Sequence, residues 1–308
     1  MQKMNRMAVG VVVAHAVLPG IARAAVVVHD PIPVAFTTTD GVHIVGDYWT
    51  PIDMSAKAPA VILLHMYRSD RSAWHEQIIA LEYAGFAIMA IDLRGHGDST
   101  EPAAMKLADR VVERDASLFQ AMHEDVAGAY AWLARRPEVD LSRLALIGAS
   151  VGCSVVLDYA ARDRSVDAVV LLSPGTKYLG VDSLAHIKRY GPRHILMCTS
   201  QEEAARGFDQ LVQAAKQTGA IVEQGVFAHH RIHGTHMYGK VPDIDKRIAA
   251  FLKQHVNERQ GTKVFAAIGG DRFYADTQAA KRDVKAGDVR ILSSKEEALQ
   301  RGLKPAAR

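Results

Sequence analysis

Short apolar runs alternate with longer amphipathic stretches from about residue 35 to residue 257 of this 308-residue chain. The runs are rich in Leu or β-branched residues, and the stretches between them have apolar residues at helical spacing. This alternation is typical of a mostly parallel sheet flanked by helices. The expected strands are 35–38, 42–49, 60–64, 87–91, 144–148, 168–172, 195–199 and 221–227. The expected helices are 74–84, 117–135, 151–161, 183–190, 202–218 and 244–256.

The first 25 residues have the pattern of a secretory signal peptide. Two basic residues precede a mostly apolar stretch at 7–18, and Ala22-Arg23-Ala24 has the small-x-small spacing of a cleavage site. The apolar stretch is shorter than the ~20 residues that a membrane-spanning helix needs, which argues against a stable membrane anchor. We therefore expect residues 1–25 to be removed and the protein to be exported, to the periplasm or as a secreted protein.

The rest of the chain divides into two expected units, a main domain at 26–257 and a small tail module at 262–308. The tail contains apolar runs at 263–268 and 288–292, followed by a short helix at 294–302. A unit of this size holds little core of its own.

Charge and cysteine content limit the possible partners and cofactors. The 37 basic and 34 acidic residues give a net charge of +3 without a long run of one sign, which argues against a nucleic acid as partner. Export would permit a disulfide between Cys153 and Cys198, but both lie in strongly apolar contexts. We expect two buried thiols, and neither a metal nor another cofactor.

One motif carries a specific chemistry. The run Gly148-Ala149-Ser150-Val151-Gly152 matches G-x-S-x-G and lies between an expected strand and an expected helix. A sharp strand-to-helix turn would hold Ser150 in a strained conformation, and the two glycines would leave room for neighbouring backbone. The alternative is a serine that only caps the helix. The context favours Ser150 as an acyl-transfer nucleophile, with the N–H of Val151 as an oxyanion donor.

On this motif and two others the chain resembles the α/β-hydrolase family, and over residues 35–257 it is similar to dienelactone-hydrolase-like proteins and small serine esterases. His65-Met66-Tyr67 follows the strand at 60–64, where family members usually carry His-Gly-x. The resemblance implies that the N–H of Tyr67 is the second oxyanion donor. The run at 92–99 matches Asp-x-Arg-Gly-x-Gly-x-Ser, and we interpret it as structural, with Asp92 and Arg94 ordering the loop.

The order of functional residues in this family implies an acid after the strand at 195–199. Related sequences place the acid three positions after the residue that matches Ser200, which implies Glu203. Glu202 is the alternative, and both glutamates could instead simply begin a helix, where negative charge is favourable.

The same order implies a histidine after the strand at 221–227, and the following loop contains four of them. His233 is preferred because His-Gly carries the base in many family members, and His236 is the alternative. A metal site is disfavoured, because no Asp, Glu or Cys accompanies the histidines at ligand spacing.

The expected fold is thus an α/β-hydrolase fold with a mostly parallel eight-stranded sheet and a small C-terminal α+β appendage. Only about 20 residues separate Gly175 from Ile195, so no large cap is expected and the site should be open. The predicted activity is hydrolysis of a small-molecule carboxylic ester through an acyl-enzyme. Peptide, thioester and haloperoxidase-type reactions are alternatives, and so is a binding protein that has lost catalysis.

The tail has a second, fainter resemblance. Residues 273–276 and 293–305 resemble the small metal-binding module of Ada-type DNA-repair proteins, but the four zinc-binding cysteines of that module are absent. The resemblance therefore implies no thiolate zinc site in this chain.

Overall fold

The structure, a computed structural model, describes residues 29–228 and 232–257 and, in the tail, residues 264–267, 272–274, 289–292, 298 and 303–306. The predicted signal peptide lies outside the described residues. Within the ranges described, no helix has the length and apolar character needed to cross a bilayer.

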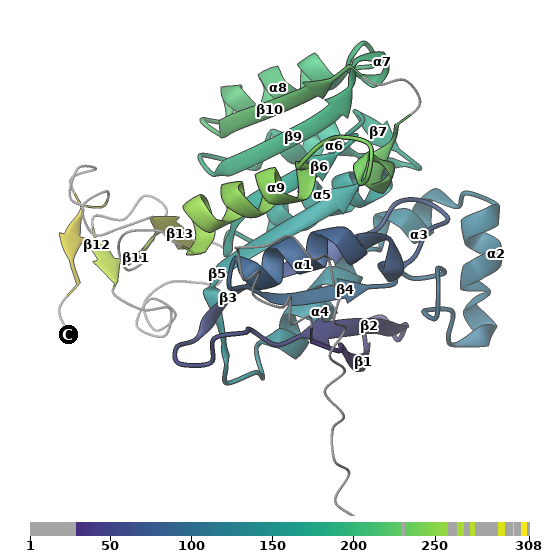
Figure 1. The fold of residues 1–308 in the computed structure, drawn as a ribbon, viewed down its shortest axis with the longest axis horizontal. Coiled ribbons are helices and arrows are strands. Elements are labelled where there is room, and N and C mark those ends of the chain that lie inside the picture. The colour runs from purple at the N-terminus through teal and green to yellow at the C-terminus, as the bar shows by residue number, and fades with distance from the viewer. Residues whose placement is uncertain are drawn as a thin grey trace, which may run out of the picture.

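An eight-stranded sheet forms the centre of the molecule (Figure 1). Its strands are β1 Ile32–Thr37, β2 His43–Trp49, β3 Ala58–Leu64, β4 Ala87–Ile91, β5 Val139–Ala149, β6 Val166–Leu172, β9 His194–Ser200 and β10 Ile221–Phe227. The order is β1-β2-β4-β3-β5-β6-β9-β10, with β2 antiparallel to β1 and β4 and all later neighbours parallel. β3 and β4 are buried along their whole length, which accounts for their continuous apolar sequences. The predicted mostly parallel eight-stranded sheet is confirmed.

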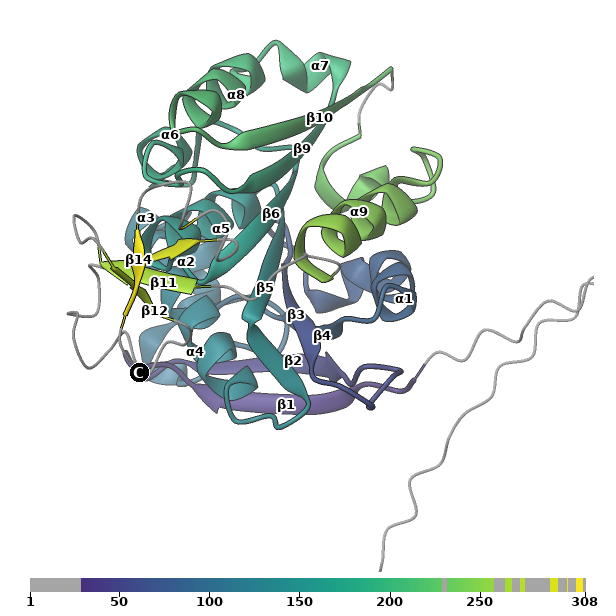
Figure 2. The same ribbon diagram turned by 90° about the vertical axis from the view of Figure 1, so that its left-hand side faces the viewer.

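Helices cover both faces of this sheet (Figure 2). The helices and helical turns are η1 Arg71–Trp74, α1 His75–Tyr83, η2 Ala103–Met105, α2 Leu107–Val112, α3 Ala116–Gln120, α4 His123–Leu133, α5 Val151–Arg162, α6 Ser183–Ile187, α7 Gln201–Ala204, α8 Phe208–Gln217, η3 Gly234–Met237, α9 Ile244–Leu252 and η4 Lys253–Asn257. α1 and α9 pack on one face, and α4, α5, α6 and α8 pack on the other.

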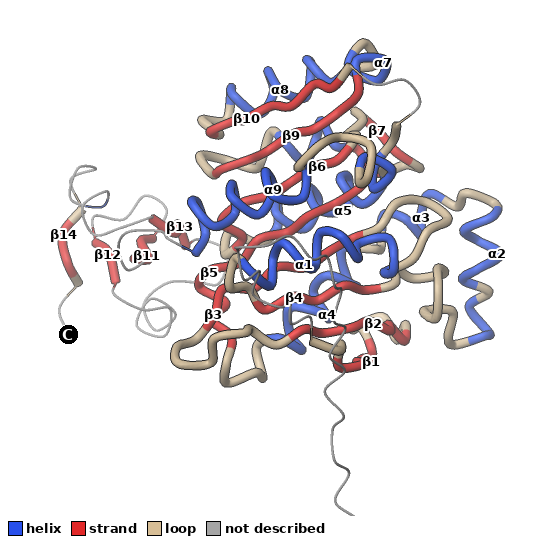
Figure 3. Tube along the Cα trace, in the orientation of Figure 1, coloured by secondary structure: helices blue, strands red, loops and turns tan. Residues whose placement is uncertain are grey.

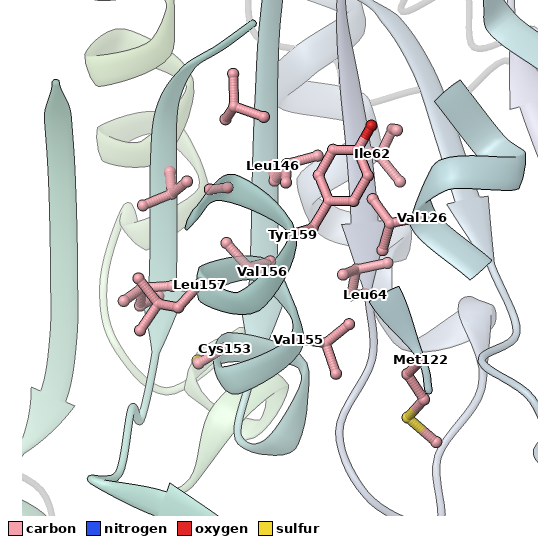
Figure 4. Packing of buried hydrophobic residues seen from close by; sticks show 14 of the residues in the cluster. Ile62, Leu64, Met122, Val126, Leu146, Cys153, Val155, Val156, Leu157 and Tyr159 are labelled. Atoms are coloured by element: carbon pink, nitrogen blue, oxygen red, sulfur yellow. The ribbon is translucent and has the colours of Figure 1, made fainter. Parts of the chain in front are cut away.

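Among the helices that the structure describes, α5 has the largest share of buried residues, and it packs over the middle of the sheet (Figure 4). Val155, Val156 and Leu157 on α5 are at most 1% exposed and belong to the same cluster as Ile62 on β3 and Leu146 on β5. Burying an aliphatic side chain of this size contributes about 1.5–3 kcal/mol. The helix that begins directly after Ser150 is therefore firmly held against the strand that precedes it.

Two predicted helices are each divided in the structure. Residues 117–135 form α3 and α4. In a continuous helix the Gln120 carbonyl would accept the Glu124 amide, but it bonds to the His123 ring at 2.8 Å, and the Glu124 amide donates to the Ala121 carbonyl. Residues 202–218 form α7 and α8, because Gly207 between them has a φ of +99°. Neither break interrupts the apolar pattern, so periodicity alone does not predict it.

Two of the small elements that were not predicted lie at the same edge of the sheet (Figure 3). One is α2, and the other is the hairpin of β7 Lys177–Tyr178 and β8 Val181–Asp182 between β6 and α6. The side-chain amide of Gln120 on α3 donates to the carbonyl of Gly180 in this hairpin at 3.0 Å. The hairpin and α6 take up residues 177–187 of the short connection from β6 to β9, which leaves no room there for a large cap, as predicted.

The described parts of the tail form a four-stranded sheet in the order β13-β11-β12-β14. β11 Val264–Ala267 and β13 Val289–Leu292 coincide with the predicted apolar runs, whereas β12 Arg272–Tyr274 and β14 Lys304–Pro305 were not predicted. Of the predicted helix at 294–302, only Ala298 is among the described residues. The domain boundaries at 26–257 and 262–308 stay a prediction.

A buried guanidinium holds the loop after β4. Arg94 is 3% exposed and donates from Nε and its backbone amide to Asp125 on α4, at 2.8 and 3.0 Å. Its two terminal nitrogens bond to Asp40 in the β1–β2 turn at 2.5 and 3.0 Å. Because Asp125 is fully buried, its charge depends on this partner.

Replacing Arg94 by Ala should therefore lower the free energy of unfolding by about 3–5 kcal/mol, because the Asp125 carboxylate would be left buried and unpaired. Urea unfolding of the two proteins measures this difference. Lys246→Ala is the control, since its pair with Asp243 is exposed on both sides, and it should unfold like the wild type. A loss below about 1 kcal/mol for Arg94→Ala would contradict this role of the buried pair.

Candidate active site

Ser150 lies at the turn between β5 and α5, in a backbone conformation that L-residues rarely adopt. Its φ is 53° and its ψ is −116°, and its N–H donates to the carbonyl of Leu172 on β6 at 2.9 Å. The residue is only 6% exposed. Strain of this kind persists only where the surrounding structure imposes it, and it is found mostly at functional sites.

The two glycines of the motif are required by close backbone approaches. A Cβ on Gly148 would lie 2.4 Å from the carbonyl oxygen of Gly152, inside the first turn of α5. A Cβ on Gly152 would lie 2.3 Å from the carbonyl oxygen of Leu64, at the end of β3. Only glycine fits at either position, and the start of α5 is thereby held against the end of the neighbouring strand.

The loop after β3 contains the predicted oxyanion residue Tyr67 and is a tight turn. The Ser69 amide donates to the Met66 carbonyl at 3.2 Å, and Arg68 between them has a φ of 56°. The Tyr67 hydroxyl donates to the carbonyl of Val111 at 3.2 Å, and this hydrogen bond connects the Tyr67 side chain to helix α2. The N–H of Val151 is the first amide of α5, a position for which a helix provides no carbonyl partner. The assignment of Tyr67 and Val151 as oxyanion donors stays a prediction.

His65 fixes this loop through both ring nitrogens. Nδ1 lies 2.8 Å from the Met66 carbonyl, and Nε2 accepts the N–H of Leu93 at 2.9 Å. An amide only donates, so Nε2 is unprotonated and Nδ1 carries the proton. Complete burial, together with the neighbouring His96, lowers the pKa of His65 to about 3. His65 is thus a neutral structural residue.

The loop after β4 is ordered by the residues that the sequence pattern singled out. The buried Asp92 carboxylate accepts the backbone amides of Arg71 and Asp98, both at 2.8 Å, and pairs with the Arg71 guanidinium. A Cβ on Gly97 would lie 2.1 Å from this carboxylate. The interpretation of this run as structural agrees with these contacts.

Glu203 and His233 are in direct contact. The Glu203 carboxylate, on α7 just after β9, receives a hydrogen bond from Nδ1 of His233, in the loop after β10. The other carboxylate oxygen lies 3.5 Å from the hydroxyl of Thr199. Burial alone would raise the pKa of Glu203, but the hydrogen bonds from His233 and Ser173 outweigh it and lower that pKa. Glu203 is therefore an ionised partner for the imidazole at neutral pH.

The alternatives to Glu203 and His233 are more exposed than these two residues. Glu202 and His236 are both exposed, and the carboxylate that bonds to His233 is that of Glu203. His229 and His230, the other histidines of this loop, lie outside the described residues. In the part of the chain that the structure describes, no group of three or more His, Cys, Asp or Glu side chains is arranged to hold a metal ion.

The loop of His233 packs against the turn of Ser150. Gly234 has a φ of 54°, and a Cβ there would lie 3.3 Å from the Cβ of Ala149. The Gly234 N–H donates to the hydroxyl of Ser173, the residue that follows β6, at 2.9 Å. The residue after His233 thus lies close to the residue before Ser150, and the two functional candidates lie at one edge of the sheet.

Two residues near this site were not predicted. Thr199 is the last residue but one of β9, and Ser173 follows β6. Both lie at the edge where Ser150 lies, and both approach the Glu203 carboxylate. Their position at the carboxyl ends of parallel strands was the available signal. The two cysteines, as predicted, are buried free thiols.

Because His65 stays neutral when folded but takes up a proton near pH 6.5 when unfolded, it should make stability depend on pH. The unfolded chain binds more protons between these two pKa values, so the free energy of unfolding falls as the pH falls below 6.5. Relative to His65→Gln, the wild type should lose roughly 2 kcal/mol between pH 7 and pH 5. Urea unfolding at both pH values measures this, and equal losses in the two proteins would contradict it.

Comparisons with known proteins place this arrangement in a family. Residues 59–221, more than half of the chain, match the family model described as alpha/beta hydrolase fold. An uncharacterised protein of Mycobacterium tuberculosis is 30% identical over 152 residues, which are 49% of this chain and 48% of that protein. Monoacylglycerol lipase of Mycolicibacterium smegmatis is 33% identical over 141 residues, 46% of this chain and 45% of the lipase.

The chain thus spans about half the length of the curated relatives it matches. Among solved structures, an esterase from Pyrococcus furiosus superposes with a TM-score of 0.56 at 19% identity, over 74% of this chain and 91% of the esterase. This likeness concerns the fold. Together with the eight-stranded sheet and the strained turn at Ser150, the family match shows that the chain belongs to the α/β-hydrolase family.

Proposed function

We propose that this protein is a serine hydrolase that cleaves a small carboxylic ester through Ser150, His233 and Glu203. The observation that carries the proposal is the hydrogen bond between His233 and the ionised Glu203, in a loop that packs against the turn of Ser150. A nucleophile on a strained turn, a histidine and an orienting carboxylate are the three groups that acyl transfer needs. The likeness to a lipase and an esterase supports an ester as substrate.

In the first step His233 acts as the general base. The bond from Nδ1–H to Glu203 leaves Nε2 as the free acceptor, which takes the proton of the Ser150 hydroxyl as the oxygen attacks the ester carbonyl. The negative charge that develops on the carbonyl oxygen is stabilised by the N–H groups of Val151 and Tyr67. Glu203 stabilises the imidazolium that forms.

The tetrahedral intermediate then collapses. His233 returns the proton to the leaving alkoxide, the alcohol departs, and the acyl group remains on Ser150. Water enters, His233 removes one of its protons, and the hydroxide attacks the acyl carbonyl. The second collapse releases the carboxylic acid and restores the Ser150 hydroxyl, so no cofactor is consumed. Removal of the predicted signal peptide and export belong to the same proposal.

Substitutions at the three residues test the proposal against neighbours of the same type. With a p-nitrophenyl ester of a short acid, Ser150→Ala and His233→Gln should each lower kcat/KM by at least about 10⁴-fold, and Glu203→Gln by about 10²–10⁴-fold. The matched controls are Ser142→Ala at the far end of β5, Glu202→Gln and His236→Gln, all exposed residues. These should keep activity within about twofold of the wild type.

The controls separate the proposed residues from the alternatives. Activity that survives in Ser150→Ala, or a larger loss from Glu202→Gln or His236→Gln than from the residues proposed, would contradict the assignment. Circular dichroism of every variant establishes that a loss of activity is not a loss of fold.

A further inference from the structure

Ser173 is a buried serine at the carboxyl end of β6 that the mechanism above does not use. It is 1% exposed, and each of its backbone groups is bonded. Its N–H donates to the carbonyl of Cys198 on β9 at 2.7 Å, and its carbonyl accepts the hydroxyl of Tyr178 at 3.3 Å. The residue is thus fixed between two strands and the β7–β8 hairpin.

The backbone of Ser173 is in the left-handed region, with a φ of 57°. A glycine adopts this conformation without strain, whereas a serine does not. A side chain is held here against a conformational preference, and the hydroxyl is the only group that distinguishes it from alanine. The contacts of that hydroxyl are therefore the feature that a serine, and not a glycine, provides at this strained position.

The hydroxyl of Ser173 holds the loop of the proposed base. Its oxygen accepts the N–H of Gly234, the residue that follows His233, at 2.9 Å. The same hydroxyl helps to lower the pKa of the Glu203 carboxylate, which receives Nδ1–H of His233. The end of β6 is thereby connected to the residue next to His233.

We propose that Ser173 is a positioning residue, whose hydroxyl holds the His233 loop in the arrangement in which Nδ1–H meets the Glu203 carboxylate. This inference rests on the proposed function of the site. The tyrosine that bonds to the Ser173 carbonyl also packs on the base, since the rings of Tyr178 and His233 are 6.2 Å apart in an edge-on arrangement. Ser173 therefore acts on His233 through its hydroxyl, which holds Gly234, and through its carbonyl, which holds Tyr178.

Ser173→Gly is the most informative variant, because it removes the hydroxyl and also relieves the backbone strain. The fold should therefore persist, because the relieved strain offsets part of the cost of the lost hydrogen bond. Loss of the bond that holds the His233 loop should lower kcat by between about tenfold and 100-fold, with KM within about twofold. Ser173→Ala, which removes the hydroxyl and keeps the strain, should lose the same activity at a lower Tm.

A double-mutant cycle distinguishes positioning from a structural role. If Ser173 acts by placing His233 against the carboxylate, Ser173→Gly should cost less than about twofold once Glu203 is already Ala. Ser154→Ala is the matched control, since Ser154 is also buried and its hydroxyl bonds to that of Ser183 at 2.7 Å. Its effect on kcat should be small and equal in both backgrounds. An equal loss from Ser173→Gly in both backgrounds, or no loss at all, would overturn the inference.

A proton NMR spectrum separates this inference from the proposed function. The proton between His233 Nδ1 and Glu203 should give a low-field resonance that disappears in His233→Gln, and Ser173→Gly should broaden or shift it. The resonance does not require turnover. If the wild type cleaves no ester, the proposed function fails, and the resonance still decides the role of Ser173: a change on Ser173→Gly supports it, and an unchanged resonance overturns it.

Discussion

The close packing of backbone around the turn at Ser150 is the constraint on which the rest of the site depends. Gly148 and Gly152 leave no space for a Cβ against the first turn of α5 and the end of β3, and this contact brings the β3 loop to the start of the helix. The buried side chains of α5 keep the helix in that place. Ser150 adopts its strained conformation because the strand before it and the helix after it are both fixed.

The parallel sheet then brings the remaining groups to the same edge. The acid follows β9, the histidine follows β10, and Ser173 follows β6, so three crossovers deliver side chains from distant parts of the sequence to neighbouring strand ends. Charged pairs hold the loops of this edge. Arg94 with Asp125 and Asp40, and Asp92 with Arg71, fix the loop after β4, and the neutral His65 fixes the loop after β3.

Local pattern was sufficient to predict the sheet and the turn at Ser150, whereas the acid and the histidine were implied by the resemblance to the α/β-hydrolase family. Buried strands are short apolar runs between turn residues, and the G-x-S-x-G motif between a strand and a helix indicates one particular turn, so both can be read over a few residues. The choice between the two candidate acids does not follow from local pattern. Glu202 and Glu203 are adjacent and chemically identical, and only the backbone direction at the start of α7 selects the one that bonds to His233.

Features that depend on distant residues could not be predicted. The partners of Arg94 lie 31 and 54 positions away in the sequence, and the hydroxyl of Ser173 meets an amide 61 positions later. The division of the predicted helix at 202–218 follows from the positive φ of Gly207, which no apolar spacing records. Such contacts arise from packing and not from local propensity, and the sequence contains no local signal for them.

The most direct test of the central claim, that Ser150 is an activated nucleophile, is labelling with an organophosphonate followed by peptide mass spectrometry. A phosphonate reacts with a serine only where a base and oxyanion donors assist, so it reports on the whole site at once. The account predicts one adduct per chain, on the peptide that contains Ser150, and none in Ser150→Ala. An unlabelled wild type, or an adduct on another residue, would contradict it and would favour a binding protein with a hydrolase fold.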